Sequence, residues 1–412
     1  MLRIAKLPNS AQHSLRNSIS IKSNQVIILI TNRCMNRILY YKGYTQYHNI
    51  GDQLINKSLL DHFRKHASIV VSDAKMPDFY LQNLEVTDAE RVSKKGKGFH
   101  SALVADAFNA CFNPQKKVYF LASPPGHQFD NSFVTGCKYV LTGLFYLLLN
   151  ILGVEIIKIG FSIGPLSSMG KIGERFRAWF VRNYYVRDSI SLKYAKGIGV
   201  NHAKFFPDLC WSYQPNPETR ITTPDGYPSS ALPKVVLSFR SAVHGESAVD
   251  AYEQSLVQIL ERILMTHQDQ FHFEIAYQVA SDKDFSKQLY ETFKSRFPIT
   301  LRQEQIDLQG AGYYSSADFV LTNRLHVALL AYKFACLPII LTDIQQHAKI
   351  NGIFSDAGLK ELLVDTQKGT PTALTNVAHV LQNKTLLLAK LQSEESAYHQ
   401  LAINIMSDIF KT

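Results

Sequence analysis

The chain has 412 residues, of which 46% are hydrophobic and 19% are charged, and its formal net charge is +10. This composition excludes a largely disordered protein, and the length fits two domains better than one compact core. The positive charge favours anionic partners, namely phosphorylated small molecules, nucleic acid or a lipid surface, without choosing between them. The five cysteines never form a Cys-x-x-Cys spacing, which argues against a disulfide framework and a zinc site and favours a reducing cytoplasm.

Residues 1–34 differ from the rest of the chain. They hold five basic residues and no acid, and the first carboxylate of the chain is Asp52. A stretch rich in Ser, Asn and Gln without an apolar period is typical of a disordered leader or a transit-like segment. A third interpretation, which we favour, is that Met35 is the true start, because a strand is expected almost immediately after it. We predict that a chain beginning at Met35 keeps its fold and activity, which expression of that chain and intact-mass analysis of native protein would test.

Between residues 35 and 213, apolar runs alternate with segments of helical spacing. We expect strands at 37–42, 69–72, 118–122 and 155–160, helices at 55–65 and 133–150, and closing elements at 188–194 and 204–207. This alternation predicts a mostly parallel sheet with helices on both faces. The longest apolar stretch, 139–153, is too short and too interrupted to span a bilayer comfortably, so we expect a buried helix there.

A proline-rich segment, 214–233, separates this half from a second one, 234–370. Its five prolines lie among Thr, Ser and Gly, as in a linker or a surface connection. In the second half we expect strands at 234–239, 271–277, 318–322 and 338–341, helices at 248–265 and 325–334, and a helical tail at 371–412. Two such halves predict a cleft with active residues at the carboxyl ends of strands.

The segment 49–52 (Asn-Ile-Gly-Asp) marks a strand–turn–helix junction. Gly51 permits a tight turn or the close approach of a ligand to the backbone, and Asp52 stands where a helix begins. An Asp that only caps the helix is an equally ordinary interpretation.

Two further segments follow predicted strands. After the strand expected to end near Gly160, Ser162 and Gly164 leave backbone N–H groups free to cradle an anion, although an ordinary Gly-Pro turn explains them as well. Arg187 either pairs with Asp188 or a neighbour as a surface ion pair or clamps a carboxylate or phosphate in the cleft. Ser189 is a candidate helix cap.

The strongest signal is the segment 318–331, a buried strand that leads directly into an apolar helix with Arg324 and His326 in its first turn. A cation at that position opposes the helix dipole, which indicates an anion beside it. The alternative is an arginine in a salt bridge and a histidine in the core. Lys349, after the next strand, is a further candidate anion ligand.

In their order along the chain these segments resemble the polysaccharide pyruvyltransferases. The matching segments are 49–52, 160–165, 186–188 (Val-Arg-Asp), 207–208 (Pro-Asp), 237–240 (Leu-Ser-Phe-Arg), 323–326 (Asn-Arg-Leu-His) and 349–352 (Lys-Ile-Asn-Gly), and the resemblance covers about residues 37–365. Two positions depart from the family pattern. Residues 123–127 (Ser-Pro-Pro-Gly-His) replace a common glycine cluster, which affects the acceptor side, and Thr322-Asn323 stands where a serine commonly precedes the arginine.

The resemblance implies a glycosyltransferase-B-like fold of two Rossmann-like domains facing a cleft. It also implies that phosphoenolpyruvate is the donor, so that neither a cofactor nor a metal is required. Arg324 and Arg187 would hold the donor's charges, His326, with a near-neutral pKa, would be the acid, and Asp52 would accept the hydroxyl proton. The remaining residues expected to contact substrate are Asn49, Gly51, Ser162, Gly164, Arg240 and Lys349.

The acceptor would be a sugar of a polysaccharide such as exopolysaccharide or capsule, or of its precursor. The sequence does not distinguish a free, a nucleotide-bound and a lipid-linked acceptor. We expect a cytoplasmic enzyme, which meets the inner face of the membrane if the acceptor is lipid-linked. The basic segments 91–97 and 175–182 are then candidate contacts with anionic lipid. The oligomeric state stays undetermined.

Three other functions compete with this one. A glycosyltransferase of the same fold needs a diphosphate site in the same place, and only the release of phosphate from phosphoenolpyruvate would separate the two. A non-catalytic scaffold for polysaccharide assembly is disfavoured by the intact Arg324 and His326. Nucleic-acid binding would rest on the short basic run at 91–97, which a solvated loop explains better.

Overall fold

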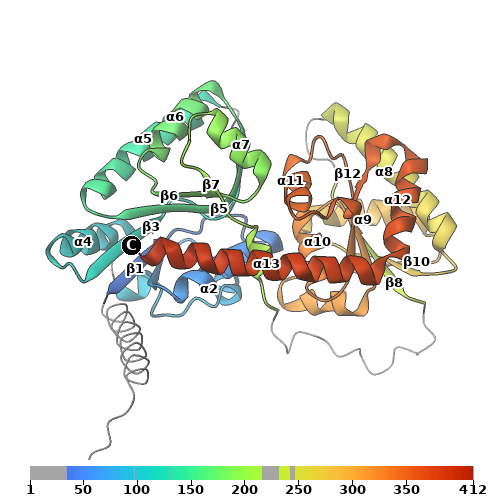
Figure 1. Ribbon diagram of the computed structural model, residues 1–412. Helices are drawn as coiled ribbons and strands as arrows, with labels where there is room; N and C mark the ends of the chain where they lie inside the picture. Colours follow the sequence, from blue (N-terminus) through green and yellow to red (C-terminus); the bar gives the residue numbers. More distant parts are fainter. Residues whose placement is uncertain (1–34, 97, 131, 216–231, 242–245, 412) are drawn as a thin grey trace, which may run out of the picture.

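The computed structural model describes residues 35–96, 98–130, 132–215, 232–241 and 246–411, with the side chains of 246–250 excepted. Within these residues the chain forms two α/β units, each built on a parallel sheet with helices on both faces (Figure 1). The predicted fold class is thereby confirmed. The leader at 1–34 and most of the proline-rich segment, at 216–231, lie outside the described residues.

The first unit contains a seven-stranded parallel sheet in the order β2-β1-β3-β5-β6-β7, with β4 paired to the far half of β5. Its strands are β1 (Asn36–Tyr41), β2 (Ser68–Val71), β3 (Lys116–Leu121), β4 (Gly126–Asp130), β5 (Glu155–Leu166), β6 (Asn183–Val186) and β7 (Lys204–Phe205). Its helices are α2 (Ile50–Arg64), α3 (Asp78–Asn83), α4 (Phe99–Phe112), α5 (Phe133–Ile151), α6 (Ser168–Ala178) and α7 (Ser189–Gly197), with 3₁₀ turns η1 (Ser93–Lys95) and η2 (Leu209–Ser212).

The second unit contains a six-stranded parallel sheet in the order β10-β9-β8-β11-β12-β13. Its strands are β8 (Lys234–Ser238), β9 (His272–Ile275), β10 (Ile299–Leu301), β11 (Phe319–Thr322), β12 (Leu337–Thr342) and β13 (Leu363–Asp365). Its helices are α8 (Glu246–His267), α9 (Lys283–Phe293), α10 (Leu325–Tyr332), α11 (Ala348–Asp356), α12 (Thr370–Gln382) and α13 (Lys384–Lys411), with 3₁₀ turns η4 (Ala280–Asp282), η5 (Gln309–Ser316), η6 (Lys360–Leu362) and η7 (Thr366–Lys368).

The β11–α10 junction shows how the sequence sets up the site. All four residues of β11 are buried, and β11 is flanked by β8 and β12. Nearly every residue of α10 is buried as well, which explains why this segment is apolar without a period. Between them the backbone of Arg324 is extended and forms the N-cap of α10. The junction therefore presents Arg324 and His326 at the carboxyl end of a central strand.

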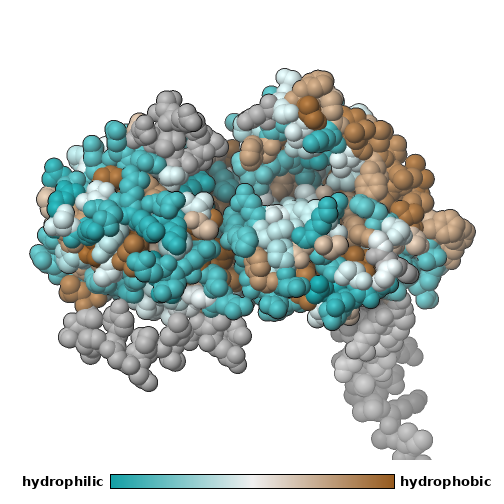
Figure 2. All heavy atoms as spheres, turned by 180° about the vertical axis from the view of Figure 1, so that it is seen from behind, coloured by the Kyte–Doolittle hydropathy of each residue, from teal (hydrophilic) through white to brown (hydrophobic). Residues whose placement is uncertain are grey.

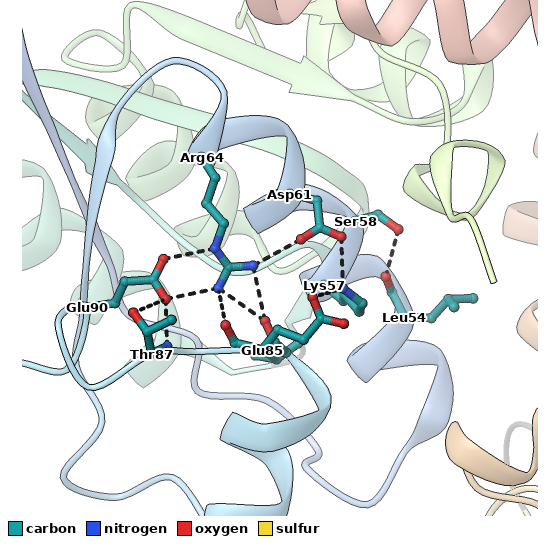
Figure 3. A network of polar contacts seen from close by, with 9 residues as sticks. Leu54, Lys57, Ser58, Asp61, Arg64, Glu85, Thr87 and Glu90 are labelled. Carbon is teal, nitrogen blue, oxygen red and sulfur yellow. Dashed lines mark hydrogen bonds and ion pairs between the residues drawn. The ribbon is translucent and has the colours of Figure 1, made fainter. Parts of the chain in front are cut away.

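Helix α2 is anchored at its far end by Arg64, whose side chain ties it to the following loop (Figure 3). The Arg64 guanidinium donates to Glu90 Oε1 at 2.8 Å, to Asp61 Oδ1 at 3.0 Å and to the carbonyl oxygen of Glu85 at 2.9 Å. Lys57 adds ion pairs to Asp61 and Glu85, each at 3.0 Å. Each contact is partly exposed and individually weak, but together they fix the helix whose first turn faces the second unit.

The last helix, α13, joins the two units. It has 28 residues, a length of about 42 Å, and it runs from the second unit across the first (Figure 1). Near its end the Phe410 ring packs 5.8 Å from Phe63 and 4.7 Å from Tyr119. Closer to the start of α13, Glu395 forms an ion pair with Lys333 of the second unit. Lys333 Nζ also donates to the carbonyl oxygen of Trp211 at 2.9 Å. A helical tail was expected, but its return to the first unit was not.

Three local expectations are wrong. The strand predicted to end near Gly160 continues to Leu166, because β4 pairs with its second half at Gly126↔Phe161. Gly51 lies within the first turn of α2 and not in a loop before it. The apolar helix expected to be buried, α5, buries only four residues, because the domain covers just one of its faces. Elements without a long apolar run, such as α6, α9 and β4, were not predicted.

Candidate active site

A cavity of about 1200 Å³ lies between the two units, where the loops after β6, β8, β9, β11 and β12 converge. Nine of the ten residues expected at the site line it, from both units: Asn49, Asp52, Ser162, Gly164, Arg187, Arg240, Arg324, His326 and Lys349. The tenth, Gly51, lies just behind the lining. The structure thus brings together residues up to three hundred positions apart, while their chemical roles stay predictions.

Gly51 makes room for His326. A Cβ atom on Gly51 would lie 1.9 Å from His326 Nδ1 and 2.6 Å from Cγ of the same ring. Any side chain at position 51 would therefore have to displace the imidazole or separate the two units. The expected close approach at Gly51 exists, but the group that approaches is a histidine of the second unit rather than a ligand. Asn49 fixes this turn as the N-cap of α2, because its side chain accepts from Gly51 N at 3.0 Å.

Arg187 lies in a buried network of the first unit. Its guanidinium donates to Ser162 Oγ at 2.9 Å and pairs with Asp208 at 3.0 Å. Ser162 in turn donates to Asp188 Oδ2 at 2.7 Å. Arg187 thus forms an ion pair, as one alternative expected, but with Asp208 rather than Asp188, and the pair is buried instead of lying on the surface. Arg187 lines the cavity with its charge already balanced.

The segment around Gly164 does not provide the expected anion cradle. It belongs to β5, and two of its backbone N–H groups are already used: Ile163 N donates to Ser191 Oγ at 3.0 Å and Leu166 N to Tyr194 Oη at 2.7 Å. The carbonyl oxygen of Gly164 lies 2.9 Å from His127 Nε2. Gly164 contributes to the cavity wall, and its φ of 105° is one that a side chain would rarely allow.

The start of α7 forms a second contact between the units. Asp188, and not Ser189, caps the helix, because its carboxylate accepts from Ser191 N at 2.6 Å. Ser189 instead donates through N and Oγ to Asp356 of α11, at 2.7 and 2.6 Å. A Cβ atom on Gly352 would lie 3.0 Å from Asp188 Cβ, so α11 and α7 are closely packed. The cavity is therefore bounded by contacts on two sides.

Arg324 has an anionic partner within the protein. Its Nη2 pairs with Asp282, which also lines the cavity, so the helix-dipole argument by itself no longer requires a ligand. Its Nε, however, is buried without a hydrogen-bond partner among the described residues. Thr322 Oγ1 accepts from Arg324 N at 3.0 Å and so holds the backbone turn. One edge of the guanidinium thus remains available.

Arg240 is held at the backbone and free at its charged end. The Asn323 side chain accepts from Arg240 N at 3.0 Å and donates to the carbonyl oxygen of Arg240 at 2.9 Å. Asn323 departs from the serine that is common in the family, and these two bonds give that departure a structural role. Among the described residues the guanidinium forms a hydrogen bond only with His347 Nε2, at 3.5 Å, and its Nε has no partner there. Burial and the nearby Arg324 lower the pKa of Arg240 to about 10.

Lys349 and Asp52 face each other from opposite units. Burial, with Arg187 and Arg240 nearby, lowers the pKa of Lys349 to about 7. Burial raises the pKa of Asp52, although hydrogen bonds from Thr45 Oγ1 (2.5 Å) and Gln46 N (3.2 Å) oppose this. Neither Arg240 nor Lys349 forms an ion pair with any acidic residue that the structure describes. The second unit therefore contributes unbalanced positive charge.

His326 departs from the expected near-neutral imidazole. Burial lowers its pKa to about 3, and the cations Lys349, Arg187 and Arg324 act in the same direction, opposed by Asp208. Its Nε2 is buried without a hydrogen-bond partner in the described structure. The protein's own groups thus keep the imidazole neutral near pH 7. A bound anion would raise this pKa, because it offsets the surrounding cations.

One group of side chains in the described structure has metal-ligand character. Ligand atoms of Asp208, Cys210 and His326 lie within 4.8 Å of one another. Arg187 already pairs with Asp208, and burial raises the pKa of the Cys210 thiol. The trio would offer a metal only a neutral imidazole and a carboxylate that is already paired, which is a poor donor set.

Several residues of the site were missed from the sequence. Asp208 belongs to a family-like segment but was given no role, although it balances Arg187 and lies beside His326. Asp282 follows no motif and reaches Arg324 only through the fold. Tyr139 and Arg177 line the first unit's wall, with the Arg177 guanidinium 3.9 Å above the Tyr139 ring. No local pattern marks these residues, because long-range packing places them.

Two Rossmann-like units with a cationic cavity at the carboxyl ends of their strands define a glycosyltransferase-B-like fold. The UDP-GlcNAc 2-epimerase from Neisseria meningitidis, solved with UDP-GlcNAc bound, matches 91% of this chain and 100% of its own at 10% identity and a TM-score of 0.53. A putative UDP-N-acetylglucosamine 2-epimerase from Listeria monocytogenes matches 92% of this chain and 97% of its own at 10% identity and a TM-score of 0.51. At this identity the likeness concerns the fold alone.

The model of the polysaccharide pyruvyl transferase family matches residues 49–342, and the chain belongs to this family. The chain is accordingly a transferase, and the predicted family is confirmed. No curated protein matches the sequence.

Proposed function

We propose that the protein transfers pyruvate from phosphoenolpyruvate to a sugar of a polysaccharide or its precursor, forming a ketal and releasing phosphate. The observation that carries this proposal is the set of buried nitrogen atoms without partners on one wall of the cavity. Arg240 Nε, Arg324 Nε and His326 Nε2 are buried without partners in the described structure, and Lys349 lies among them. Phosphoenolpyruvate brings roughly three negative charges near neutral pH, in a carboxylate and a phosphate, which such a wall would bind.

The reaction needs one proton donor and one proton acceptor. Protonation of the donor's methylene carbon gives an oxocarbenium-like centre at C2, which a sugar hydroxyl attacks as it loses its proton. Cleavage of the C2–O bond then releases phosphate, and a second hydroxyl attacks C2 to close the ketal, its proton leaving with the phosphate. The bound trianion would raise the pKa of His326 from its low value and so load the acid, while Asp52, whose pKa burial raises, would take the hydroxyl proton. The proposed mechanism uses neither a metal nor a cofactor.

The proposed setting is the cytoplasm, with an acceptor destined for exopolysaccharide or capsule. The test is direct. Calorimetric titration should show that phosphoenolpyruvate binds and UDP does not, and phosphate should be released only when phosphoenolpyruvate and a sugar acceptor are both present. Binding of a nucleotide-sugar with transfer of its sugar would replace this function by glycosyl transfer.

Variants of Arg324 test its part in donor binding. Arg324→Ala should weaken phosphoenolpyruvate binding while the fold is kept, and Arg324→Lys should rescue it poorly because a point charge cannot replace a two-pronged contact. The matched control is Arg296→Ala, which removes an exposed arginine paired with Glu261 outside the cavity. Normal donor affinity in Arg324→Ala would contradict the assignment.

A further inference from the structure

The first unit exposes an unusual apolar surface over α4, α5 and α6, which we call the apolar face. Its exposed members include Phe112 (75% exposed), Ile151 (72%), Phe133 (69%), Leu141 (65%), Trp179 (64%) and Leu148 (49%). In the rear view, hydrophobic residues gather at the end of the molecule formed by these helices (Figure 2). Scattered exposed apolar residues are ordinary, but a contiguous patch of this kind marks a binding surface.

The apolar residues follow helical spacing. On α5, Leu141, Leu144, Leu148 and Ile151 stand three or four positions apart and are all exposed. Helix α5 is also the one helix in the described structure that is long and apolar enough to cross a membrane by length and composition. Its outer stripe therefore has a hydrophobic surface that the first unit leaves uncovered.

The opposite side of α5 is fixed in the domain. A Cβ atom on Gly136 would lie 2.5 Å from the Met169 carbonyl carbon, and one on Gly173 would lie 2.5 Å from the Gly136 carbonyl oxygen. Helices α5 and α6 thus touch backbone to backbone through glycines. A helix held in this way presents one face outward and cannot cross a bilayer without unfolding the unit. Contact with a membrane would have to be interfacial.

The charged residues on α5 and α6 indicate which kind of surface the apolar face would bind. Lys138, Lys171 and Arg175 are exposed on α5 and α6. Residues 131–182 contain only two acids, Glu155 and Glu174, and both are already ion-paired. Cations beside exposed leucines and a tryptophan, without a competing exposed acid, complement an anionic lipid surface. Two copies of this face related by a two-fold axis would instead bring like charges together.

Within the basic run suggested from the sequence, Arg91 fits this role less well, whereas Lys94 and Lys95 are exposed. Arg91 forms ion pairs with Asp73 at 2.9 Å and Asp78 at 3.4 Å, and it lies 3.9 Å from Asp88. Its charge is therefore largely balanced within the protein, unlike the charges of Lys171 and Arg175.

The apolar face adjoins the cavity. Tyr139 of α5 and Arg177 of α6 line the cavity wall. Phe129 also lines it and is 59% exposed, four residues before Phe133. We infer that the apolar face docks on the interface of an anionic bilayer and so holds the first unit's side of the cavity next to lipid-linked sugars. The docking stands by itself, whereas the identity of the lipid-linked acceptor rests on the proposed function.

The test is sedimentation of the full chain with vesicles of phosphatidylglycerol and phosphatidylcholine, compared with phosphatidylcholine alone, at low and high salt. We expect binding to the anionic vesicles that salt weakens. Leu141→Gln with Leu148→Gln should lower the partition coefficient at least roughly tenfold. Lys171→Gln with Arg175→Gln should lower it roughly 30-fold at low salt and little at high salt.

The matched control carries the same change at exposed apolar residues of the second unit, Leu386→Gln with Met265→Gln, and should bind vesicles like the wild type. Absence of vesicle binding, or equal losses in the control and in the Leu141/Leu148 variant, would overturn the inference. The inference would also be overturned if the wild-type chain were a dimer in solution and the Leu141/Leu148 variant a monomer.

Phosphate release with a soluble sugar acceptor separates this inference from the proposed function. All variants of the apolar face should keep wild-type phosphate release with that acceptor, because none of the substituted residues lines the cavity. If phosphate release persists without vesicle binding, only the docking inference fails. If vesicles bind but phosphoenolpyruvate gives no phosphate, the proposed function fails and the docking surface stands.

Discussion

The two walls of the cavity differ in how their charges are satisfied. On the first unit's wall, Arg187 pairs with Asp208, Arg177 with Glu174, and Asp188 is held by serine donors. On the second unit's wall, Arg240 and Lys349 form no ion pair with the described residues, and Arg324 keeps a free Nε beside its bond to Asp282. A wall that balances its own charge suits a neutral ligand, and a wall with excess cations suits an anion. We therefore propose that the sugar binds to the first unit and the donor to the second.

The largest effect is expected where the walls meet, at His326. His326→Asn should lower turnover by roughly two to four orders of magnitude, because proton donation is lost, while phosphoenolpyruvate binding largely survives. Phosphate-release kinetics together with calorimetric titration would measure both quantities. Near-normal turnover in this variant would remove His326 from the mechanism.

Gly51 tests the contact between the walls without changing any charge. Gly51→Ala places a methyl group 1.9 Å from the present position of His326 Nδ1, so the imidazole must move. We expect turnover to fall by roughly 100-fold, the cost of misplacing a catalytic group by about 1 Å. Gly98→Ala is the control, since a Cβ atom there meets only Ser101 Oγ, at 3.1 Å. Equal activity of the two variants would show that His326 can move freely.

The division of ligands between the walls is tested by a pair of variants. Arg240→Ala should weaken phosphoenolpyruvate binding by roughly tenfold to a hundredfold and leave the Michaelis constant of the sugar nearly unchanged. Tyr139→Ala should do the reverse, because it removes an aromatic surface of the first wall. Titration of the donor and kinetics against the acceptor would measure the two effects. The assignment is wrong if both variants weaken donor binding equally.

The smallest effect concerns pH. Lys349 has a pKa of about 7 in the folded chain, below its value of 10.5 when exposed, so the unfolded chain binds more protons between these values and this group's contribution to stability rises with pH there. A bound anion needs the charged form. Donor affinity should thus fall by up to roughly tenfold per pH unit above about pH 7, with proton uptake at pH 8. Calorimetry in buffers of different ionisation enthalpy would detect the uptake, and Lys349→Arg should abolish the slope.

The sequence was sufficient for the features that depend on local periodicity. Buried strands such as β11 and β12 and the apolar helix α10 were placed nearly to the residue, because segments covered on both faces are apolar throughout. Amphipathic elements such as α6 and α9 were missed, since their alternation is broken by glycines or charges. Helix α5 was found but wrongly buried, because hydrophobicity indicates contact with something apolar and does not say whether that partner is the protein's own core.

The candidate site follows the same division. Arg324, His326, Arg187 and Lys349 were found because each follows a strand, and the carboxyl ends of parallel strands meet at one edge. Their partners could not be found in that way. Asp282 lies in a 3₁₀ turn before α9, and Asp208 lies after the short strand β7, where no chemical pattern distinguishes them from other acids. The low pKa of His326 depends on burial and three neighbouring cations, which only the folded chain brings together.

The return of α13 to the first unit bears on how the protein loses its structure. Its final turn places Met406, Ile409 and Phe410 in the core that also contains Leu39 and Tyr119 of the first sheet. Because the two ends of α13 are buried in different units, unfolding of one unit removes packing contacts from the other. Heating or denaturant should therefore melt both units in one cooperative transition rather than in two. For the same reason, a fusion or deletion at the carboxyl end would destabilise the first unit, although that unit is synthesised and folds before the second.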